Sequence, residues 1–433
     1  MHVLRTTSFA FRYYSETMIE NFLEHIDACP TAHHVVNRAS ALLSANGFTQ
    51  APLDAPFAIN LLERGFVSHG GTIIAWKNAK SISAQGIRIV GAHTDSPGLH
   101  IKPNPDTQTL QWQQLQVEVY GGPLLNSWLD RDLAIAGHVV LRDGTTSLFC
   151  SELPVARIPQ LAIHLDREVN DKGLVLNRHQ HLNPIWATGA STVSFEHWLA
   201  QQNSVSDSQI ASWSAQLVDT QKAEIFGRDS EFIASSRIDN QISCWAALTA
   251  LLADAGDQPM MVALFDHEEV GSQSSTGAGG PMLEHVLERL AYASGSSRSE
   301  FLAALQKSHC VSADNAHAVH PNYTDRHELN NAPYVNKGVV IKNNVNQRYA
   351  TSPSSLVPIV HAASTAGLQL QTFSSRNNIA CGSTIGPITA TRMGIETVDI
   401  GVPQLSMHSI REMCGTRDPV ELVSLLRAYF SRL

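Results

Sequence analysis

The stretch Ile89-Val90-Gly91-Ala92-His93-Thr94-Asp95 is the part of this 433-residue chain from which the fold can be predicted most directly. Its apolar residues belong to the run Ile87–Val90, which Gly and Ser bound and which predicts a buried β-strand. His93 and Asp95 follow just past the end of this strand, where open α/β sheets bind their ligands. In a metal site, the carboxylate of Asp95 would fix the tautomer of the His93 imidazole. An isolated His-x-Asp is more often an ordinary loop, so this interpretation depends on whether other segments repeat the pattern.

Four later segments also place a carboxylate or an imidazole at the end of an apolar stretch. They read Arg237-Ile238-Asp239-Asn240, Leu264-Phe265-Asp266-His267-Glu268-Glu269, Val311-Ser312-Ala313-Asp314 and Leu405-Ser406-Met407-His408. Imidazole and carboxylate are the ligands of Zn²⁺ in sites that keep one position open for water, and two ions about 3.5–4 Å apart suit hydrolysis. One histidine, one shared aspartate and a further carboxylate would hold the first ion. The same aspartate would hold the second ion together with Glu269 and His408.

The adjacent carboxylates Glu268 and Glu269 are the sharpest local signal among these segments. At the end of the predicted buried strand Met261–Phe265 they repel each other unless a cation compensates. Because adjacent side chains diverge, Glu269 can bind a metal ion while Glu268 faces the water as a general base. Structural alternatives stay open at this point: a solvated strand end for the glutamates, a helix N-cap for Asp239 and a hydrogen-bonded core histidine for His408.

Apolar runs of strand length alternate with helical periodicity along much of the chain. Residues 17–47 predict helices broken near Pro30, and Thr72–Trp76 predicts a strand. Later helices are expected at Asp239–Leu252, Met282–Tyr292 and Leu356–Ala366, and strands at Met261–Phe265, Val311–Ala313, Val339–Ile341 and Val398–Gly401. This alternation predicts an α/β sandwich with a largely buried sheet.

The pattern changes in the middle of the chain, where apolar and polar residues alternate from Leu115 to Val119 and Asp143-Gly144 is a hairpin signal. We therefore expect two domains, one formed by residues 1–99 and 236–433 and the other a mainly β insertion of residues 100–235. Exposed loops are expected at the Ser- and Gln-rich segments Gln201–Gln216 and Ala293–Ser297.

Composition excludes several classes of protein. The formal net charge of -9 and the absence of any basic run argue against a nucleic-acid partner. No segment approaches the ~18 apolar residues that cross a bilayer, and residues 1–12 lack the apolar core of a secretory signal. We therefore expect a cytoplasmic protein, in which the six scattered cysteines stay reduced. Charged residues make up only 16%, which is compatible with a surface partly covered by other subunits.

Five strings together resemble the aspartyl aminopeptidase family of dinuclear zinc exopeptidases. They are VGAHTDSPGL at 90–99, RIDN at 237–240, EEVGS at 268–272, SADNAHAVHPNY at 312–323 and MHSIRE at 407–412. The likeness runs in order along almost the whole chain, and motif segments of this length and number are highly specific. It implies a three-layer zinc-exopeptidase-like sandwich as the catalytic domain, with the inserted domain serving in dimerisation and as a lid.

The resemblance also implies roles for individual residues. The zinc ligands would be His93, Asp239, Glu269, Asp314 and His408, with Asp239 bridging two ions and Glu268 as general base. We count Asp95 with Glu268 as catalytic because of its expected contact with the His93 imidazole. Substrate contacts would come from His317, Lys342 and Tyr349, and from His164, which enters the active site of a neighbouring subunit in a tetrahedral shell of twelve subunits. Co²⁺ or Mn²⁺ would be able to replace Zn²⁺.

Physical chemistry leaves alternatives for the substrate-contacting residues. Lys342 could be an ordinary strand-end surface lysine, although a preference for acidic N-terminal residues needs a cation such as Lys342 or His317 in the pocket. Tyr349 or His164 could donate a hydrogen bond to the tetrahedral oxyanion, or could simply pack with a satisfied polar tip.

The hypothesis from sequence is therefore a zinc aminopeptidase that releases single N-terminal residues, acidic ones in particular, from peptides. One rival is a dinuclear-metal deacylase or carboxypeptidase on the same scaffold. The other is a non-catalytic, zinc-stabilised shell protein, although a structural site would have no use for the spare carboxylate of Glu268.

Overall fold

The computed structural model describes residues 16–189, 193–253 and 256–431. Residues 1–12, on which the prediction about a secretory signal rests, lie outside this part of the chain. Contacts between residues divide the chain into two compact units. The first comprises the chain up to Asp95, Ala223–Met407 and the chain from Glu412 onward, and the second comprises Ser96–Lys222 and His408–Arg411.

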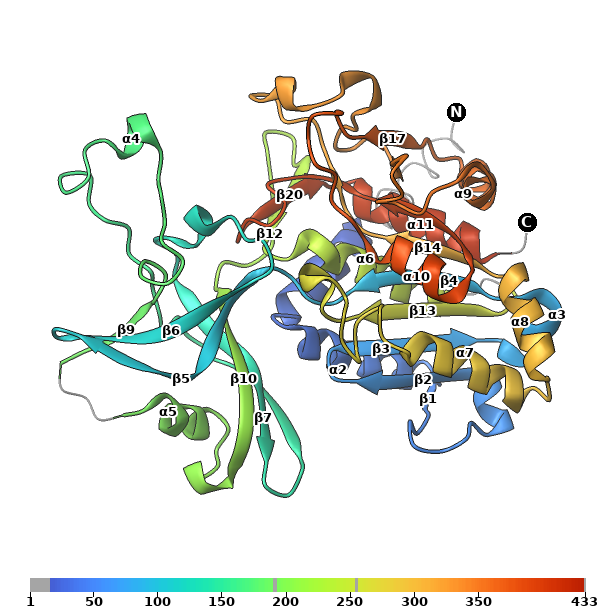
Figure 1. Ribbon diagram of the computed structural model, residues 1–433, viewed down its shortest axis with the longest axis horizontal. Helices are drawn as coiled ribbons and strands as arrows, with labels where there is room; N and C mark the ends of the chain where they lie inside the picture. Colours follow the sequence, from blue (N-terminus) through green and yellow to red (C-terminus); the bar gives the residue numbers. More distant parts are fainter. Residues whose placement is uncertain (1–15, 190–192, 254–255, 432–433) are drawn as a thin grey trace, which may run out of the picture. The chain divides into compact units, whose positions relative to one another are not determined.

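A nine-stranded sheet forms the centre of the first unit, in the order β1-β2-β3-β13-β4-β14-β18-β16-β17 (Figure 1). Four neighbouring central strands run parallel: β13 (Met260–Phe265), β4 (Arg88–His93), β14 (His309–Ala313) and β18 (Glu396–Gly401). The flanking strands are β1 (Thr49–Gln50), β2 (Arg64–His69), β3 (Thr72–Lys77), β16 (Val340–Asn343) and β17 (Gln371–Ser374). Parallel strands need long crossover connections, which the helices of this unit supply.

Helices cover both faces of this sheet. The even-numbered residues of β13 belong to one hydrophobic cluster and the odd-numbered residues to another, as expected for a strand that is buried on both sides. The first cluster includes the helical residues 16–28, α2 (Ala32–Ala45), α6 (Ile238–Leu252), α9 (Pro353–Ala366) and α11 (Asp418–Phe430). The second includes α3 (Ile82–Gln85), α7 (Met282–Ala293), α8 (Arg298–Lys307) and α10 (Ile385–Met393). The three-layer α/β sandwich predicted from the sequence is confirmed.

The first unit also contains a smaller five-stranded sheet, in the order β11-β12-β20-β19-β15. Its strands are β11 (Glu224–Phe226), β12 (Phe232–Ser235), β20 (Glu412–Gly415), β19 (Pro403–Leu405) and β15 (Ala316–His317). The sheet therefore joins three segments of the chain that are far apart in sequence. Two of them flank residues on which the predicted metal site depends.

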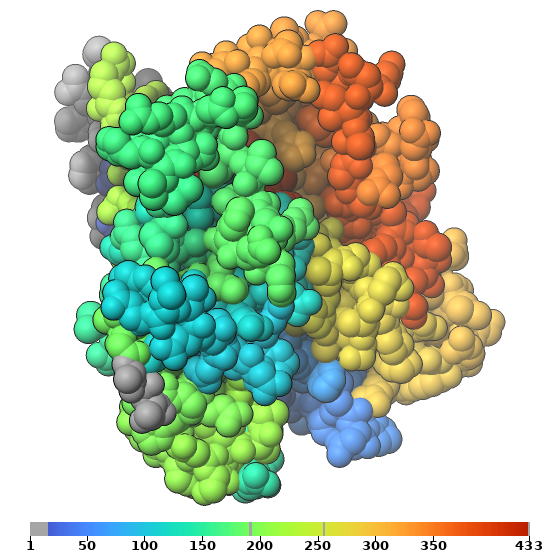
Figure 2. Space-filling view, turned by 60° about the vertical axis from the view of Figure 1, so that its left-hand side comes forward, coloured from blue at the N-terminus to red at the C-terminus, as the bar shows by residue number. Residues whose placement is uncertain are grey.

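The second unit is built on an antiparallel sheet of six strands, in the order β8-β7-β10-β5-β6-β9. The strands are β5 (Gly98–Thr109), β6 (Trp112–Tyr120), β7 (Leu133–Leu141), β8 (Thr146–Cys150), β9 (Ile185–Thr188) and β10 (Ile210–Asp219). Helix α5 (Phe195–Gln202) packs on this sheet through Phe195 and Leu199. Between β8 and β9 the chain forms the short helix α4 (Val169–Lys172), and most of residues 152–181 are exposed (Figure 2).

One sequence-based expectation was wrong and others need small corrections. Gln201–Gln216 is not an exposed loop, because β10 begins at Ile210 and pairs with both β7 and β5. The inward-facing residues of β10 are Trp213, Ala215 and Leu217. They alternate with polar residues, which made this segment resemble an exposed loop in the sequence. In addition, His93 is the last residue of β4 and does not lie past its end, and the strand predicted at Val339–Ile341 is β16 at Val340–Asn343.

No helix in the described part of the chain is long and apolar enough to span a membrane. The six cysteines all lie within the described residues, and none of them forms a disulfide. The cytoplasmic location expected from the sequence is a separate question and stays a prediction.

Candidate metal centre

The C-terminal ends of three adjacent parallel strands place the first predicted site residues side by side. His93 ends the middle strand, β4, and pairs in register with Phe265 of β13. Glu268 follows β13 and begins a single 3₁₀ turn, Glu268–Val270, while Asp314 follows β14 on the other side. Because parallel strands end at the same edge of a sheet, these groups meet although His93 and Asp314 are 221 residues apart in the sequence.

Asp239 reaches this edge from the start of α6. Asp239 and Asn240 lie within the helix bounds but have non-helical dihedral angles, so the regular helix begins after them. The backbone N–H of Asp239 donates to Glu412 Oε2 at 2.9 Å, and the side-chain amide of Asn240 donates to the carbonyl of Ala313 at 2.8 Å. These two bonds fix the position of this segment against β20 and the end of β14.

Two non-glycine residues with left-handed backbone conformation stand directly before these segments. Arg237 has φ 61° and His267 has φ 62°. Such a conformation costs roughly 1–2 kcal/mol for a residue with a side chain and persists where contacts hold it. The guanidinium of Arg237 donates to the carbonyls of Cys29 and Ile26, and the backbone N–H of His267 donates to Asp266 Oδ1. The turns that aim Asp239 and Glu268 are therefore held from outside the site.

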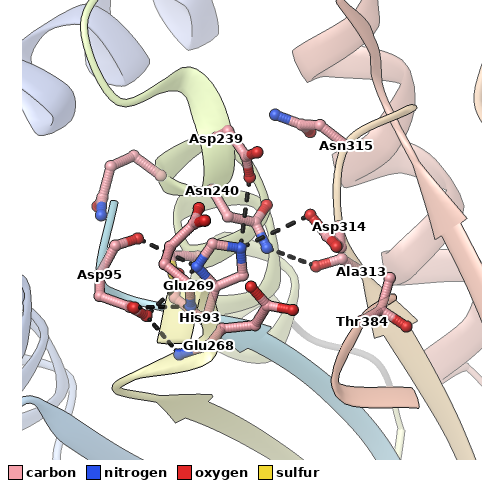
Figure 3. A network of polar contacts seen from close by, with 12 residues as sticks. His93, Asp95, Asp239, Asn240, Glu268, Glu269, Ala313, Asp314, Asn315 and Thr384 are labelled. Atoms are coloured by element: carbon pink, nitrogen blue, oxygen red, sulfur yellow. Dashed lines mark hydrogen bonds and ion pairs between the residues drawn. The ribbon is translucent and has the colours of Figure 1, made fainter. Parts of the chain in front are cut away.

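The imidazole of His93 lies at the centre of a group of carboxylates (Figure 3). Its Nε2 is 3.3 Å from Asp239 Oδ1 and 3.6 Å from Asp314 Oδ1. Two ligand atoms that bind one tetrahedral zinc at about 2.0–2.1 Å are roughly 3.3 Å apart, so this spacing fits a shared ion. Ligand atoms of His93, Asp239 and Glu269 also all lie within 4.8 Å of one another. The donor set of imidazole and carboxylate suits zinc.

Electrostatics point to a cation at the same place. Burial lowers the pKa of His93, but hydrogen bonds to Asp239, Asp314 and Asp95 outweigh burial and raise that pKa well above its usual value. Burial raises the pKa of Glu268 to about 7, opposed by His93 and reinforced by the neighbouring aspartates. The shift of His93 expresses the surrounding carboxylates, and that of Glu268 expresses mainly burial with a further contribution from the aspartates; a bound dication would neutralise this negative charge.

Asp95 connects the imidazole to the glutamate turn. Its carboxylate accepts hydrogen bonds from the backbone N–H groups of Glu268 and Glu269, at 3.1 and 3.0 Å. Its Oδ1 lies 3.4 Å from His93 Nδ1, and its own carbonyl oxygen lies 3.0 Å from the same nitrogen. Asp95 can therefore orient the imidazole and the turn that carries the predicted base at once.

Lys342 is buried beside Asp314 and is not a surface residue. Its ammonium donates to the Asp314 carbonyl at 3.1 Å, the Asp314 carboxylate at 3.4 Å and the Asn315 carbonyl at 2.9 Å. It also lies 4.8 Å from the ring centre of Tyr349. Since a lysine has three N–H donors, Lys342 positions Asp314 in this arrangement.

His317 and Tyr349 lie on either side of one aromatic ring. The ring centre of Phe373 is 5.8 Å from that of His317 and 6.3 Å from that of Tyr349. His317 is exposed, whereas Tyr349 is buried, and burial raises the pKa of its hydroxyl far above the ordinary range. The structure thus groups these two residues with Lys342 next to Asp314.

The remaining predicted residues belong to the second unit. His408 has φ 68°, and its Nδ1 lies 3.1 Å from the carbonyl oxygen of Gly122. His164 lies in an exposed turn between β8 and α4. The first unit by itself therefore brings together His93, Asp95, Asp239, Glu268, Glu269 and Asp314.

Two buried acids near the site have no role in the sequence-based prediction. Glu412 receives the N–H of Asp239, and it stands in the quoted string MHSIRE, which offered the signal. Asp399 in β18 accepts hydrogen bonds from Thr384 Oγ1 and the backbone N–H of Ala350, both at 2.6 Å. The sequence did offer a signal for Asp399, because it is a carboxylate inside the apolar strand Val398–Gly401. A buried acid needs hydrogen-bond donors such as Thr384 and Ala350.

Comparisons with known proteins agree with this geometry. The family model for the aminopeptidase I zinc metalloproteases (M18) matches residues 25–430. The chain is 45% identical over 419 residues to a probable M18 family aminopeptidase 2 of Streptomyces coelicolor, covering 95% of this chain and 96% of the relative.

Solved structures show the same architecture. The chain resembles one in a cryo-EM structure of the Ape4 and Nbr1 complex, with a TM-score of 0.92 and 35% identity, covering 96% of this chain and 86% of the other. It also resembles the mApe1 dodecamer of S. cerevisiae, with a TM-score of 0.82 and 26% identity, covering 96% and 97% of the two chains.

Proposed function

Since the chain belongs to the M18 family of zinc aminopeptidases, we propose that its metal centre holds two zinc ions and hydrolyses the first peptide bond of peptides. The chain is thus a hydrolase, and the family resemblance found in its motifs is confirmed. What goes beyond the family is the assignment of individual residues. The observation that carries this assignment is the meeting of His93, Asp239, Asp314 and the Glu268–Glu269 turn at one sheet edge.

In this proposal His93, Asp239 and Asp314 would hold one zinc ion, and Asp239, Glu269 and His408 would hold the other. When bound, such ions would supply a water molecule with a pKa lowered towards ~7 and Lewis-acid polarisation of the scissile carbonyl. The spacings of 3.3 and 3.6 Å around His93 Nε2 support the first ligand set.

Glu268 acts as the general base. Its carboxylate takes the proton of the attacking water and then passes it to the leaving amine, which requires a pKa near the working pH. Burial, which raises the pKa of Glu268 to about 7, supplies this property. Asp95 keeps the carboxylate in place through the backbone of the turn.

The test of this assignment is Glu268→Gln, which preserves shape and removes the base. We expect zinc content near that of the wild type and a loss of kcat of at least about 10²-fold, because general-base catalysis contributes on that order. Glu24→Gln, an exposed glutamate of the same unit, is the matched control. Near-normal turnover of Glu268→Gln with peptide substrates would refute the role of Glu268. Chelation should abolish activity, and Zn²⁺, Co²⁺ or Mn²⁺ should restore it.

We further propose a preference for acidic N-terminal residues, with the cationic side of the pocket formed by His317 and Lys342. A carboxylate entering a buried pocket needs a charged partner to offset its desolvation. His317 is the more accessible of the two, while Lys342 would have to exchange its longest contact, the one to the Asp314 carboxylate. Tyr349 or His164 would donate to the oxyanion.

Specificity is tested by kcat/KM for dipeptides that begin with Asp, Glu, Leu or Ala. We expect the acidic pair to be favoured and His317→Phe to reduce that preference while hydrolysis of the Leu peptide changes little. Equal rates for all four peptides would remove the proposed cationic pocket. N-acetylated versions of the same peptides should resist hydrolysis, which separates an aminopeptidase from a deacylase.

Self-association into a tetrahedral homododecamer completes the proposal. The S. cerevisiae mApe1 structure is a dodecamer. On the exposed segment of the second unit that carries His164, Leu161 is 59% and Leu165 74% exposed, and apolar side chains of this size call for a partner. His164 would then reach the active site of a neighbouring subunit.

A further inference from the structure

A second cavity lies in the helical layer of the first unit, away from the metal centre. It measures about 550 Å³, is partly open to solvent, and is lined by residues of the helical segment 16–28, of α2 and of α6. Ligand pockets commonly measure about 300–1,000 Å³, so this volume suits a small molecule. None of the proposed metal or substrate residues lines it.

The lining of this cavity combines apolar and polar side chains. The apolar lining comes from Met18, Leu42, Trp245, Leu248 and Leu252. The polar lining includes Asn21, Asn46, His25 and Arg38, and the lining contains no acidic residue among those that the structure describes. A ligand would therefore meet a cationic side chain and an apolar surface in the same cavity.

His25 has an unsatisfied hydrogen-bonding group at this cavity. The residue is 3% exposed, and its Nε2 makes no hydrogen bond of good geometry within the described part of the chain, although the side chain of Gln241 interacts with the ring. A buried polar atom without a partner is costly and calls for an explanation, such as a ligand or water that binds there. Burial, reinforced by the charge of Arg38, lowers the pKa of His25 to about 3, so the ring is neutral and can offer an N–H.

Among the described residues of the lining, Arg38 is the only one that carries a formal charge. No acid of the described chain forms an ion pair with it, although guanidinium groups this close to a protein interior usually find a carboxylate. The charge of the same guanidinium acts on both His25 and Cys29, so it lies close to both of these buried residues.

We propose that this cavity binds a small monocarboxylate with an unbranched apolar tail. The carboxylate would pair with Arg38 and accept a hydrogen bond from His25 Nε2, and the tail would pack against Trp245, Leu248 and Leu252. A free amino acid fits less well, because its ammonium group would find no acid in the lining. The proposal does not depend on the function assigned to the metal centre.

Isothermal titration calorimetry with octanoate tests this site on the zinc-loaded protein. We expect saturable binding of octanoate, at least about tenfold weaker binding of octanamide and none of octylamine, since a hydrogen-bonded charge pair contributes a factor of about 10 or more. Arg38→Gln should weaken octanoate binding by a similar factor, and Arg38→Lys should restore part of it. Arg326→Gln, on an exposed loop, is the charge control.

A second pair of variants separates this cavity from binding at the metal centre. Ala41→Phe fills the mouth of the cavity from α2, while Ala45→Phe places the same ring on the same helix outside the lining. Both alanines are exposed, so neither variant should affect folding, which circular dichroism can check. Loss of binding in Ala41→Phe alone supports the site. Octanoate binding that is unchanged in both Ala41→Phe and Arg38→Gln, or no binding to the wild type, overturns it.

Discussion

Asp95 shows how a single side chain can couple two parts of a catalytic site. Its carboxylate accepts the backbone N–H groups of Glu268 and Glu269 while it faces the imidazole of His93. Asparagine has the same shape but only one acceptor oxygen, and its amide group would point at a backbone N–H. The substitution would therefore disturb the orientation of both the His93 imidazole and the Glu268 carboxylate.

We accordingly predict that Asp95→Asn lowers kcat/KM by about 10- to 100-fold, the range typical for loss of a group that supports a metal ligand. Zinc affinity, measured by competition with a chelator, should fall as well. Asp54→Asn, an exposed aspartate of the same unit, should match the wild type. Unchanged kinetics in Asp95→Asn would mean that the turn is held by its other contacts.

Glu268 also predicts the direction of the pH dependence. A general base works only when deprotonated, so kcat/KM should fall as the pH drops through the pKa of Glu268. Burial raises this pKa to about 7, and bound cations, which favour the carboxylate, would place the acidic limb at or below that value. Below the limb, activity should fall about tenfold for each pH unit.

Asp266 is a competing source of such an acidic limb. Burial and the charge of Asp95 raise the pKa of Asp266 to about 6. The measurement is therefore a profile of kcat/KM from pH 5 to 9 for the wild type and Asp266→Asn, with zinc content checked at each pH. The limb should persist in Asp266→Asn. Its disappearance there would transfer the titration from Glu268 to Asp266.

At the level of single residues, the sequence reveals the ligand types well and their supports poorly. His93, Asp239 and Asp314 are conspicuous because each polar group ends an apolar run, and the structure does bring them together. Glu412 is not conspicuous, because its contact with Asp239 spans 173 positions and leaves no local pattern. The same holds for Lys342, whose partners at Asp314 and Asn315 become visible only in the fold.

Among the secondary-structure elements, strands buried on both faces were easier to predict than strands buried on one. The continuous apolar run of β13 has no helical period, and its bounds differ from the expectation by one residue. In β10 only every second residue faces the core, so the Ser- and Gln-rich exposed positions conceal the strand. The order β13-β4-β14 was beyond prediction, since β4 lies between two strands that follow each other much later in the chain.

Leu217 tests the corrected role of β10. This residue is 1% exposed within the core of the second unit, so Leu217→Ala should lower the free energy of unfolding by about 2–5 kcal/mol. Gln216→Ala, which changes the neighbouring position on the opposite face of the strand, should cost less than about 1 kcal/mol. Urea denaturation followed by tryptophan fluorescence measures both. A small effect of Leu217→Ala would favour the loop that the sequence suggested.

For the whole molecule, composition led us to expect neither a nucleic-acid partner nor a membrane partner. The number of subunits cannot be predicted from composition. A charged fraction of 16% is compatible with covered surface but does not say which surface is covered. The structure narrows this question, because Leu161 and Leu165 expose most of their apolar area on the segment that carries His164. A surface of that kind gains stability when it is buried against a partner.

We therefore predict that the double variant Leu161→Asp and Leu165→Asp dissociates the assembly into smaller species. Burying two unpaired carboxylates at an interface is costly, whereas exposing them on a separate subunit is not. Leu110→Asp, which changes a leucine of the same unit that is 87% exposed, is the matched control. If His164 serves a neighbouring active site, dissociation should also lower kcat while zinc content stays unchanged. Sedimentation velocity decides the first point: a double variant that sediments like the wild type would show that this segment lies outside the subunit contacts.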